Sequence, residues 1–241
     1  MSGRLYLGLD AGTSLTKAAI FDLEGRELAV AEKPTAVQRP RPGWSEIDPH
    51  EAWAAAVEVM ARVVRDGGVD PARIAGIGVS AAMVGAWVLD AAFQPLRPAI
   101  TWEDSRSQAL IDAHLAADPE FLSRIFASTG SVMQQGCTLP VMAWLARHEP
   151  DVLRRAAHVL CFKDYLRLRM TGEVATDRTE AAVLPGSARA RDRSDEMIAL
   201  FGLEAHAHLL PPVRDSESFC GVLSPEVAAV TGLPAGVPVA A

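Results

Sequence analysis

Five residues between positions 10 and 17 combine an acid, a flexible turn residue, two hydroxyls and a cation: Asp10, Gly12, Thr13, Ser14 and Lys17. The backbone N–H groups of such a turn can form a concave nest that binds phosphate oxygens, with the hydroxyls and the cation as further partners. A bare carboxylate would repel a phosphate, so Asp10 points to Mg²⁺ between the two. The alternative is a β-hairpin in which the Asp and Ser side chains only satisfy turn amides.

A second candidate site lies in "TWEDSRS", from Thr101 to Ser107, between an apolar run and a helical pattern. Trp102 could serve as an aromatic platform for a ligand, Asp104 as an acceptor for hydroxyl groups, and Arg106 as a nearby cation. The alternative is that Asp104 or Ser105 caps the helix while Trp102 fills the core.

Other polar residues have simpler interpretations. In Lys163-Asp164 we interpret Asp164 as a helix cap and Lys163 as solvated, in preference to catalysis. The three cysteines, Cys137, Cys161 and Cys220, are far apart and have no metal-ligand spacing. We therefore expect reduced, buried thiols.

The opening motif must be positioned by strands. Leu5, Leu7 and Leu9 alternate with more polar residues, which is a strand period. "TKAAIFD" and "RELAVAEKPT" read as the next two strands, and their short connections predict an antiparallel meander. A helix follows, because Asp48 can cap it, Pro49 suits its first position, and Gly67 can stop it.

The rest of the chain alternates strands and helices. Strands are predicted in "IAGIGVSA", "AWVLD", "PAITW" and "HVLCF", and helices over 105–117, 119–127, 140–148 and 163–170. The tail "CGVLSPEVAAVTGLPAGVPVAA" reads as strand, helix and strand. This order predicts an α/β fold with a mixed sheet: three antiparallel strands, then helix–strand units, with insertions but without a linker between domains.

The totals exclude several classes of protein. A formal net charge of -7 over 241 residues argues against coating nucleic acid, because phosphate neutralisation needs a basic face. No run is as long and apolar as a membrane span. The start "MSGRLYLGLDAG" reaches an Asp too soon for the core of a signal peptide. We expect a cytoplasmic protein that binds neither nucleic acid nor membranes.

The stretch "GLDAGTSLTKAAIFD" resembles the first phosphate loop of the FGGY family of carbohydrate kinases. "RPGWSEIDPHEAW", "LRPAITWEDSRS", "RHEPDVL" and "KDYLRLRMTGE" resemble xylulokinase segments, in family order. The resemblance implies a ribonuclease H-like lobe of the actin, hexokinase and Hsp70 superfamily, and ATP- and Mg²⁺-dependent phosphorylation of a sugar or polyol between two lobes. A homodimer is left open.

The resemblance also implies roles for single residues. Asp10 and Lys17 would be catalytic, with Asp10 at the metal, and Gly12, Thr13 and Ser14 would bind phosphate. Residues 1–241 would form the N-terminal lobe, and the C-terminal nucleotide-binding lobe is absent from this chain. The general base is expected beyond Ala241, so we expect the fragment to fold but to be inactive alone.

The substrate would contact Met83, Val84, Trp102, Asp104 and Arg106. Xylulokinases carry a Gln-Met-His-Gly segment where this chain has Ala82, Met83, Val84 and Gly85. A sugar hydroxyl facing the two apolar replacements would lose a partner, which costs roughly 1–3 kcal/mol. This loss counts against D-xylulose itself. The resemblance implies a pentulose such as xylulose, or a related ketose or polyol, as the substrate. A gluconokinase-like sugar-acid kinase, or a non-catalytic module that senses ATP or sugar, remains the alternative.

Overall fold

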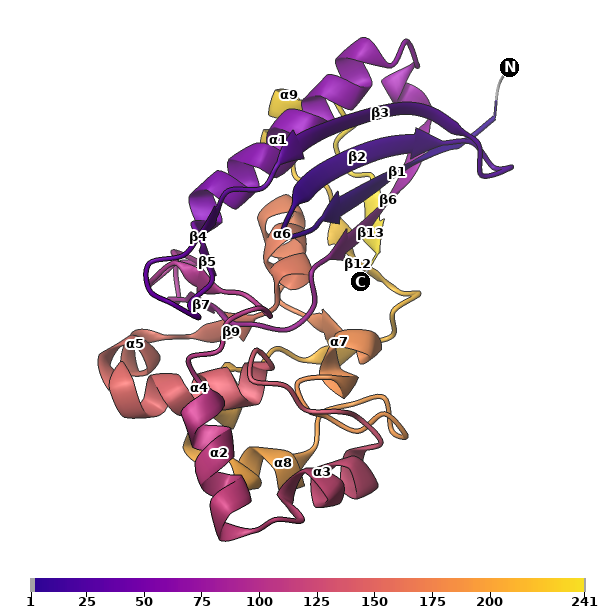
Figure 1. The fold of residues 1–241 in the computed structure, drawn as a ribbon. Coiled ribbons are helices and arrows are strands. Elements are labelled where there is room, and N and C mark those ends of the chain that lie inside the picture. Colours follow the sequence, from indigo (N-terminus) through magenta and orange to yellow (C-terminus); the bar gives the residue numbers. More distant parts are fainter. Residues whose placement is uncertain (1–2, 241) are drawn as a thin grey trace.

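A computed structural model describes residues 3–240, and a mixed sheet forms its centre (Figure 1). In spatial order the strands are β12 (Phe219–Val222), β13 (Pro238–Ala240), β6 (Ile74–Ala81), β1 (Leu5–Ala11), β2 (Leu15–Phe21) and β3 (Glu27–Pro34). β1, β2 and β3 are antiparallel neighbours, whereas β6 runs parallel to β1. The predicted meander and mixed sheet are confirmed.

Helices cover one face of this sheet: α1 (Pro49–Asp66), α6 (Phe162–Thr171) and α9 (Pro225–Thr231). α1 begins as predicted, because the Asp48 side chain accepts hydrogen bonds from the N–H groups of His50 and Glu51. It ends at Gly67, where a Cβ would come within 2.4 Å of the Val63 carbonyl oxygen. The leucines of β1 and the apolar side of α1 share one hydrophobic core.

A helical body lies below the sheet in Figure 1 and has a second hydrophobic core, drawn from residues between Ala86 and Leu210. Its helices are α2 (Gln108–Ala117), α3 (Phe121–Thr129), α4 (Thr138–His148), α5 (Pro150–Arg155), α7 (Arg178–Ala182), α8 (Asp195–Leu200) and the 3₁₀ helix η2 (Glu204–Leu209). α2 starts three residues later than the pattern predicts, because residues 105–107 belong to a polar turn at its entrance.

A two-stranded ribbon of β7 (Trp87–Leu89) and β9 (His158–Leu160) separates the two cores. Successive side chains of a strand point to opposite faces. Trp87 and Leu160 accordingly join the core of the sheet, while Val88 and Val159 join that of the helical body. The sheet and the helical body are thus packed on the two faces of one ribbon.

Short elements complete the fold: β4 (Val37–Gln38), β5 (Glu46–Ile47), η1 (Pro71–Arg73), β8 (Ala99–Ile100), β10 (Thr176–Asp177) and β11 (Val213–Arg214). The strands expected in "AWVLD" and "PAITW" form, but they pair outside the central sheet. Cys137, Cys161 and Cys220 are free and buried, as predicted. None of the helices in residues 3–240 combines the length and the hydropathy needed to cross a membrane.

Candidate functional site

The turn between β1 and β2 presents free donors. The Gly12 N–H donates to the Leu15 carbonyl at 2.8 Å, which closes the turn. This N–H is therefore not free for the phosphate that Gly12 was expected to bind, and Gly12 shapes the turn instead. Within residues 3–240, neither the backbone N–H nor the hydroxyl of Thr13 or Ser14 has a protein hydrogen-bond partner. The turn can therefore offer four donors to a bound anion.

Thr35, just after β3, holds this turn from its carbonyl side. Its hydroxyl donates to the Gly12 carbonyl at 2.8 Å, and its N–H donates to the Ser14 carbonyl at 3.0 Å. These two bonds fix the turn from its carbonyl side, while the N–H groups of Thr13 and Ser14 stay available to a ligand. Sequence reasoning missed Thr35, although its position directly after Pro34, at the end of a strand, was a signal.

Asp10 and Lys17 are opposite each other on β1 and β2, and Ser80 of β6 is opposite Asp10 on the other side. Asp10 is exposed, and the Lys17 ammonium lies 4.0 Å from the Glu32 carboxylate. No cluster of three or more His, Cys, Asp or Glu side chains that could hold a metal forms within the described part of the chain. A lone carboxylate fits Mg²⁺, which commonly takes one or two protein carboxylates plus waters and substrate phosphates.

A pocket of about 430 Å³ opens where the central sheet meets the helical body. It is lined by Ala81, Ala82, Met83, Val84, Trp102, Val132, Gln134, Gly136, Cys137 and Val183. Among these described residues, the hydrogen-bonding side chains are those of Gln134, Cys137 and Trp102, through its indole N–H, and the others are apolar. A small neighbouring cavity is bordered by Thr13 together with Met83, Val84 and Trp102. The phosphate-binding turn and the pocket are therefore adjacent.

Trp102 and Gly136 line the pocket, and their backbones lie in close contact. At Gly136 a Cβ would come within 1.8 Å of the Trp102 carbonyl oxygen, so no larger residue fits there. The Gly136 carbonyl in turn accepts from the Gly85 N–H at 3.1 Å. Trp102 is 42% exposed and lines the pocket rather than filling the core. Its geometry therefore suits the aromatic platform expected from the sequence.

Asp104 and Arg106 lie elsewhere, with side chains that have no exposed surface. Asp104 accepts from the Ser45 N–H at 2.6 Å and from three N–H groups of Arg106, each at 2.8 Å. The structure thus removes Asp104 and Arg106 from the set expected to touch a sugar. Asp104 is no helix cap either, because α2 begins beyond this turn without a side-chain cap.

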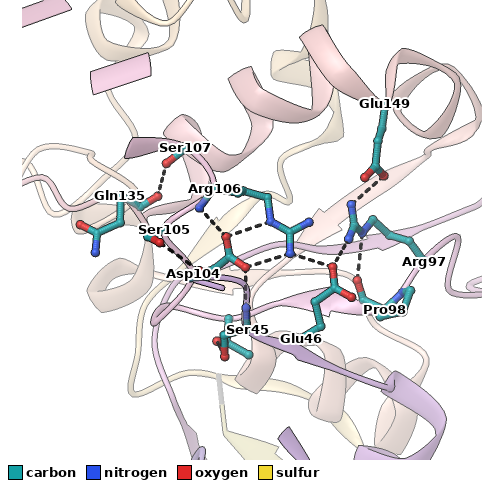
Figure 2. A network of polar contacts seen from close by, with 12 residues as sticks. Ser45, Glu46, Arg97, Pro98, Asp104, Ser105, Arg106, Ser107, Gln135 and Glu149 are labelled. Carbon is teal, nitrogen blue, oxygen red and sulfur yellow. Dashed lines mark hydrogen bonds and ion pairs between the residues drawn. The ribbon is translucent and has the colours of Figure 1, made fainter. Parts of the chain in front are cut away.

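Figure 2 shows that these two residues belong to a buried ionic network. The Arg106 guanidinium also donates to Glu46 at 2.7 Å and lies 3.8 Å from the centre of the Trp44 ring. Glu46 pairs with Arg97, whose guanidinium reaches Glu149 at 2.6 Å. The network joins β5, the segments before and after β8, and Glu149 directly before α5, and it supports the segment that carries Trp102.

The expectation for Lys163 and Asp164 is wrong. Both are buried in the first turn of α6, and Asp164 does not cap it. The Lys163 ammonium contacts Asp164 at 2.7 Å and Asp177 at 3.2 Å. These charges are buried because partners from a distant segment neutralise them.

Sequence reasoning also missed Glu180, which is 2% exposed on α7. Its carboxylate accepts from the Val84 N–H at 2.5 Å. Burial, together with the neighbouring Asp164 carboxylate, raises the pKa of Glu180 to about 7. No sequence signal marked it, because α7 has only five residues and its partner is 96 positions away.

Known proteins resemble this chain in sequence and in fold. The chain is 39% identical over 232 residues to a xylulose kinase of Klebsiella pneumoniae, covering 95% of this chain and 46% of that protein. It is 32% identical to an L-xylulose/3-keto-L-gulonate kinase of Escherichia coli strain K12, covering 97% and 47%. The crystal structure of xylulose kinase from Rhodospirillum rubrum superposes with a TM-score of 0.87 at 32% identity, covering 98% and 48%.

The chain thus spans about half the length of the curated relatives it matches. The expected α/β fold with its mixed sheet is confirmed by these structural neighbours. Residues 5–241 match the model described as the FGGY family of carbohydrate kinases, N-terminal domain. The donor-rich turn and the adjoining pocket therefore sit in a chain that belongs to the FGGY family of carbohydrate kinases.

Proposed function

We propose that this chain supplies the sugar-binding surface and the first phosphate loop of a kinase that transfers the γ-phosphoryl group of ATP to a hydroxyl of a sugar or polyol. One observation carries the proposal: Thr13, in a turn with free N–H and hydroxyl donors, borders the same small cavity as Met83 and Trp102. A hydroxyl held in the pocket would lie beside phosphate oxygens held on the turn. Phosphoryl transfer depends mainly on such positioning.

The residues in and beside the turn have separate roles in the proposed reaction. Thr13 and Ser14 hold phosphate oxygens through their N–H and hydroxyl groups, and Lys17 offsets negative charge that develops during transfer. Asp10 would hold Mg²⁺, which supplies neutralisation of phosphate charge when bound. ATP as a substrate makes the cytoplasm the expected location.

Among residues 3–240, no carboxylate or histidine lines the pocket, so the described chain supplies no such proton acceptor there. We propose that the base lies in a part of the kinase outside these 241 residues, since the chain spans about half the length of its curated relatives. The opposing lobe would also exclude water, which otherwise competes as the nucleophile.

The apolar lining limits which substrates the pocket can bind. Ala82 and Val84 face the pocket without hydrogen-bonding side chains, so the part of the substrate beside them is expected to carry few hydroxyls. We expect a ketose or polyol, with xylulose as the reference compound because relatives are named for it.

The test is ATP turnover by the full-length protein with a panel of ketoses, polyols and sugar acids, measured as ADP release. Sugar-dependent turnover is expected, and Asp10→Asn should remove most of it while sugar affinity measured by calorimetry stays within about threefold. Glu27→Gln, an exposed carboxylate on β3 of the same sheet, is the matched control and should behave like wild type. Sugar binding without turnover would indicate a sensing module rather than a kinase. Normal turnover by Asp10→Asn would rule out the proposed role of Asp10 at the metal.

A further inference from the structure

Val84 has an unusual backbone conformation at the wall of the pocket. Its φ is +55°, in the left-handed region, where a β-branched residue is a genuine outlier. Such a conformation costs free energy and persists only when surrounding contacts enforce it. The following Gly85 also has a positive φ, of +78°, but glycine adopts it readily. The contacts that enforce the conformation of Val84 therefore bear on the shape of the pocket.

In the loop of residues 82–85, Ala82, Val84 and Gly85 each form a hydrogen bond with another segment of the described chain. The Ala82 N–H donates to the Ala11 carbonyl at 2.9 Å, which links the loop to β1. Gly85 accepts from the Thr138 hydroxyl at 2.7 Å. Val84 itself is held by Glu180, at 2.5 Å from its N–H to the carboxylate oxygen Oε1. Of these ties, the one on the strained residue is the one made by an ionisable side chain.

We propose that Glu180 is a positioning residue for sugar binding, whose carboxylate holds Val84 in its left-handed conformation and so sets the wall of the pocket. The inference rests on the proposed function, because it assigns the pocket to the sugar. Glu180 does not line the pocket; it acts through the backbone of Val84.

The helix that carries Glu180 is itself anchored. Asp177 caps α7 by accepting from the N–H groups of Thr179 and Glu180. The Ser216 hydroxyl donates to Asp177 at 2.6 Å, and Lys163 lies 3.2 Å from it. Val183, directly after α7, lines the pocket. These contacts hold α7 in place, and with it the Glu180 carboxylate beside the Val84 N–H.

The ionisation of Glu180 is set by its neighbours. The ionisable groups that bear on it are Asp164 and Lys163 of α6, Cys161 before α6, Cys137 before α4, and Asp177 at the start of its own helix. With a pKa of about 7, Glu180 changes its charge near neutrality. The ionised form accepts the stronger hydrogen bond. Sugar binding should therefore weaken as the pH falls through about 7.

The test uses the full-length protein with D-xylulose as the probe, and compares wild type, Glu180→Ala, Glu180→Gln and the control Glu173→Gln, an exposed carboxylate between α6 and α7. Glu180→Ala is expected to raise the KM for the sugar about 10- to 100-fold, as for loss of a hydrogen bond to a charged group. Changes in kcat and in the KM for ATP should stay within about threefold. In wild type and in Glu173→Gln the sugar KM should rise as the pH falls from 8 to 6, and in Glu180→Gln this rise should disappear, because the amide is a neutral acceptor at both values.

Hydrogen exchange read by mass spectrometry gives a measurement that does not depend on activity. A peptide covering residues 82–86 should exchange faster in Glu180→Ala than in Glu173→Gln, and Glu180→Gln should restore most of the protection. If wild type turns over no sugar but this exchange pattern appears, the proposed function fails while the positioning role stands. If the loop exchanges at the same rate in all the variants, or the sugar KM is unchanged, the positioning role of Glu180 is refuted. Should Glu180→Ala not fold, Glu180→Gln still decides through its pH profile.

Discussion

Replacing Asp104 with Asn should destabilise the protein strongly while leaving its sugar affinity unchanged. Asp104 has no exposed surface and accepts four hydrogen bonds, from the Ser45 N–H and from three N–H groups of Arg106. An Asn side chain is nearly the same shape, but it is neutral, and its NH₂ group would face the N–H donors of Arg106. The substitution therefore leaves a buried guanidinium with half of its compensation, since Glu46 remains.

The size of the effect follows from this burial. Removing one partner of a buried ion pair costs about 3–5 kcal/mol, because the other charge stays away from water without its counter-ion. For a chain of this length, 1 kcal/mol lowers the Tm by about 2–4 °C. Asp104→Asn should therefore lower the Tm by about 6–20 °C. Glu103→Gln is the matched control: Glu103 pairs with the exposed Arg39, and exposed pairs contribute about 1 kcal/mol or less.

Thermal unfolding followed by circular dichroism measures both variants, and sugar affinity is measured by calorimetry well below the Tm. A Tm for Asp104→Asn within about 2 °C of wild type would refute the argument from burial. A loss of sugar affinity at unchanged Tm would instead restore the role of Asp104 as a substrate contact.

Three further predictions follow from the same structure. Ala82→Gln combined with Val84→His should raise kcat/KM for D-xylulose relative to other ketoses by about 5- to 100-fold, since two polar partners return to the pocket; equal ratios across a ketose panel would contradict this. The unfolding free energy of wild type relative to Glu180→Gln should fall by about 2–3 kcal/mol between pH 5 and pH 8. The reason is that a carboxyl whose pKa is raised from 4.5 to about 7 on folding contributes stability that is fully present below pH 4.5 and is lost as the pH rises through 7. Urea titrations at the two pH values measure this difference, and a constant difference would refute the pKa shift. Residues 1–241 alone should unfold cooperatively but show no sugar-dependent ADP release, and robust turnover would require a general base within them.

The parts of the fold that could be predicted from sequence depend on local signals. The period of two in β1 and the capping of α1 by Asp48 involve residues within a few positions of each other, and both are confirmed. The donor-rich turn belongs to this group, because Gly12, Thr13 and Ser14 act within one loop. Such patterns carry their own physical reason and need no tertiary contact to be read.

The residues that were misjudged depend on distant partners. Asp104 is buried because Ser45 and Arg106 complete its hydrogen bonds, and Ser45 is 59 positions away. A carboxylate beside a tryptophan reads the same from sequence whether it faces a ligand or a buried guanidinium. Lys163 likewise looks solvated until Asp177 is brought to it by the fold. Pairing across the chain, rather than residue type, decides which charged side chains are buried.

The position of β13 has a consequence for the order of assembly. It lies inside the sheet, where Val239 pairs with Ile77 across most of the length of the chain. The helical body between them draws its core from residues 86–210, so its contacts do not wait for that strand. Closing a loop costs more entropy as the flexible chain lengthens, and a segment that has already folded shortens it. The helical body should therefore form first and carry β13 back to β6, so that substitutions in its core slow completion of a sheet they do not touch.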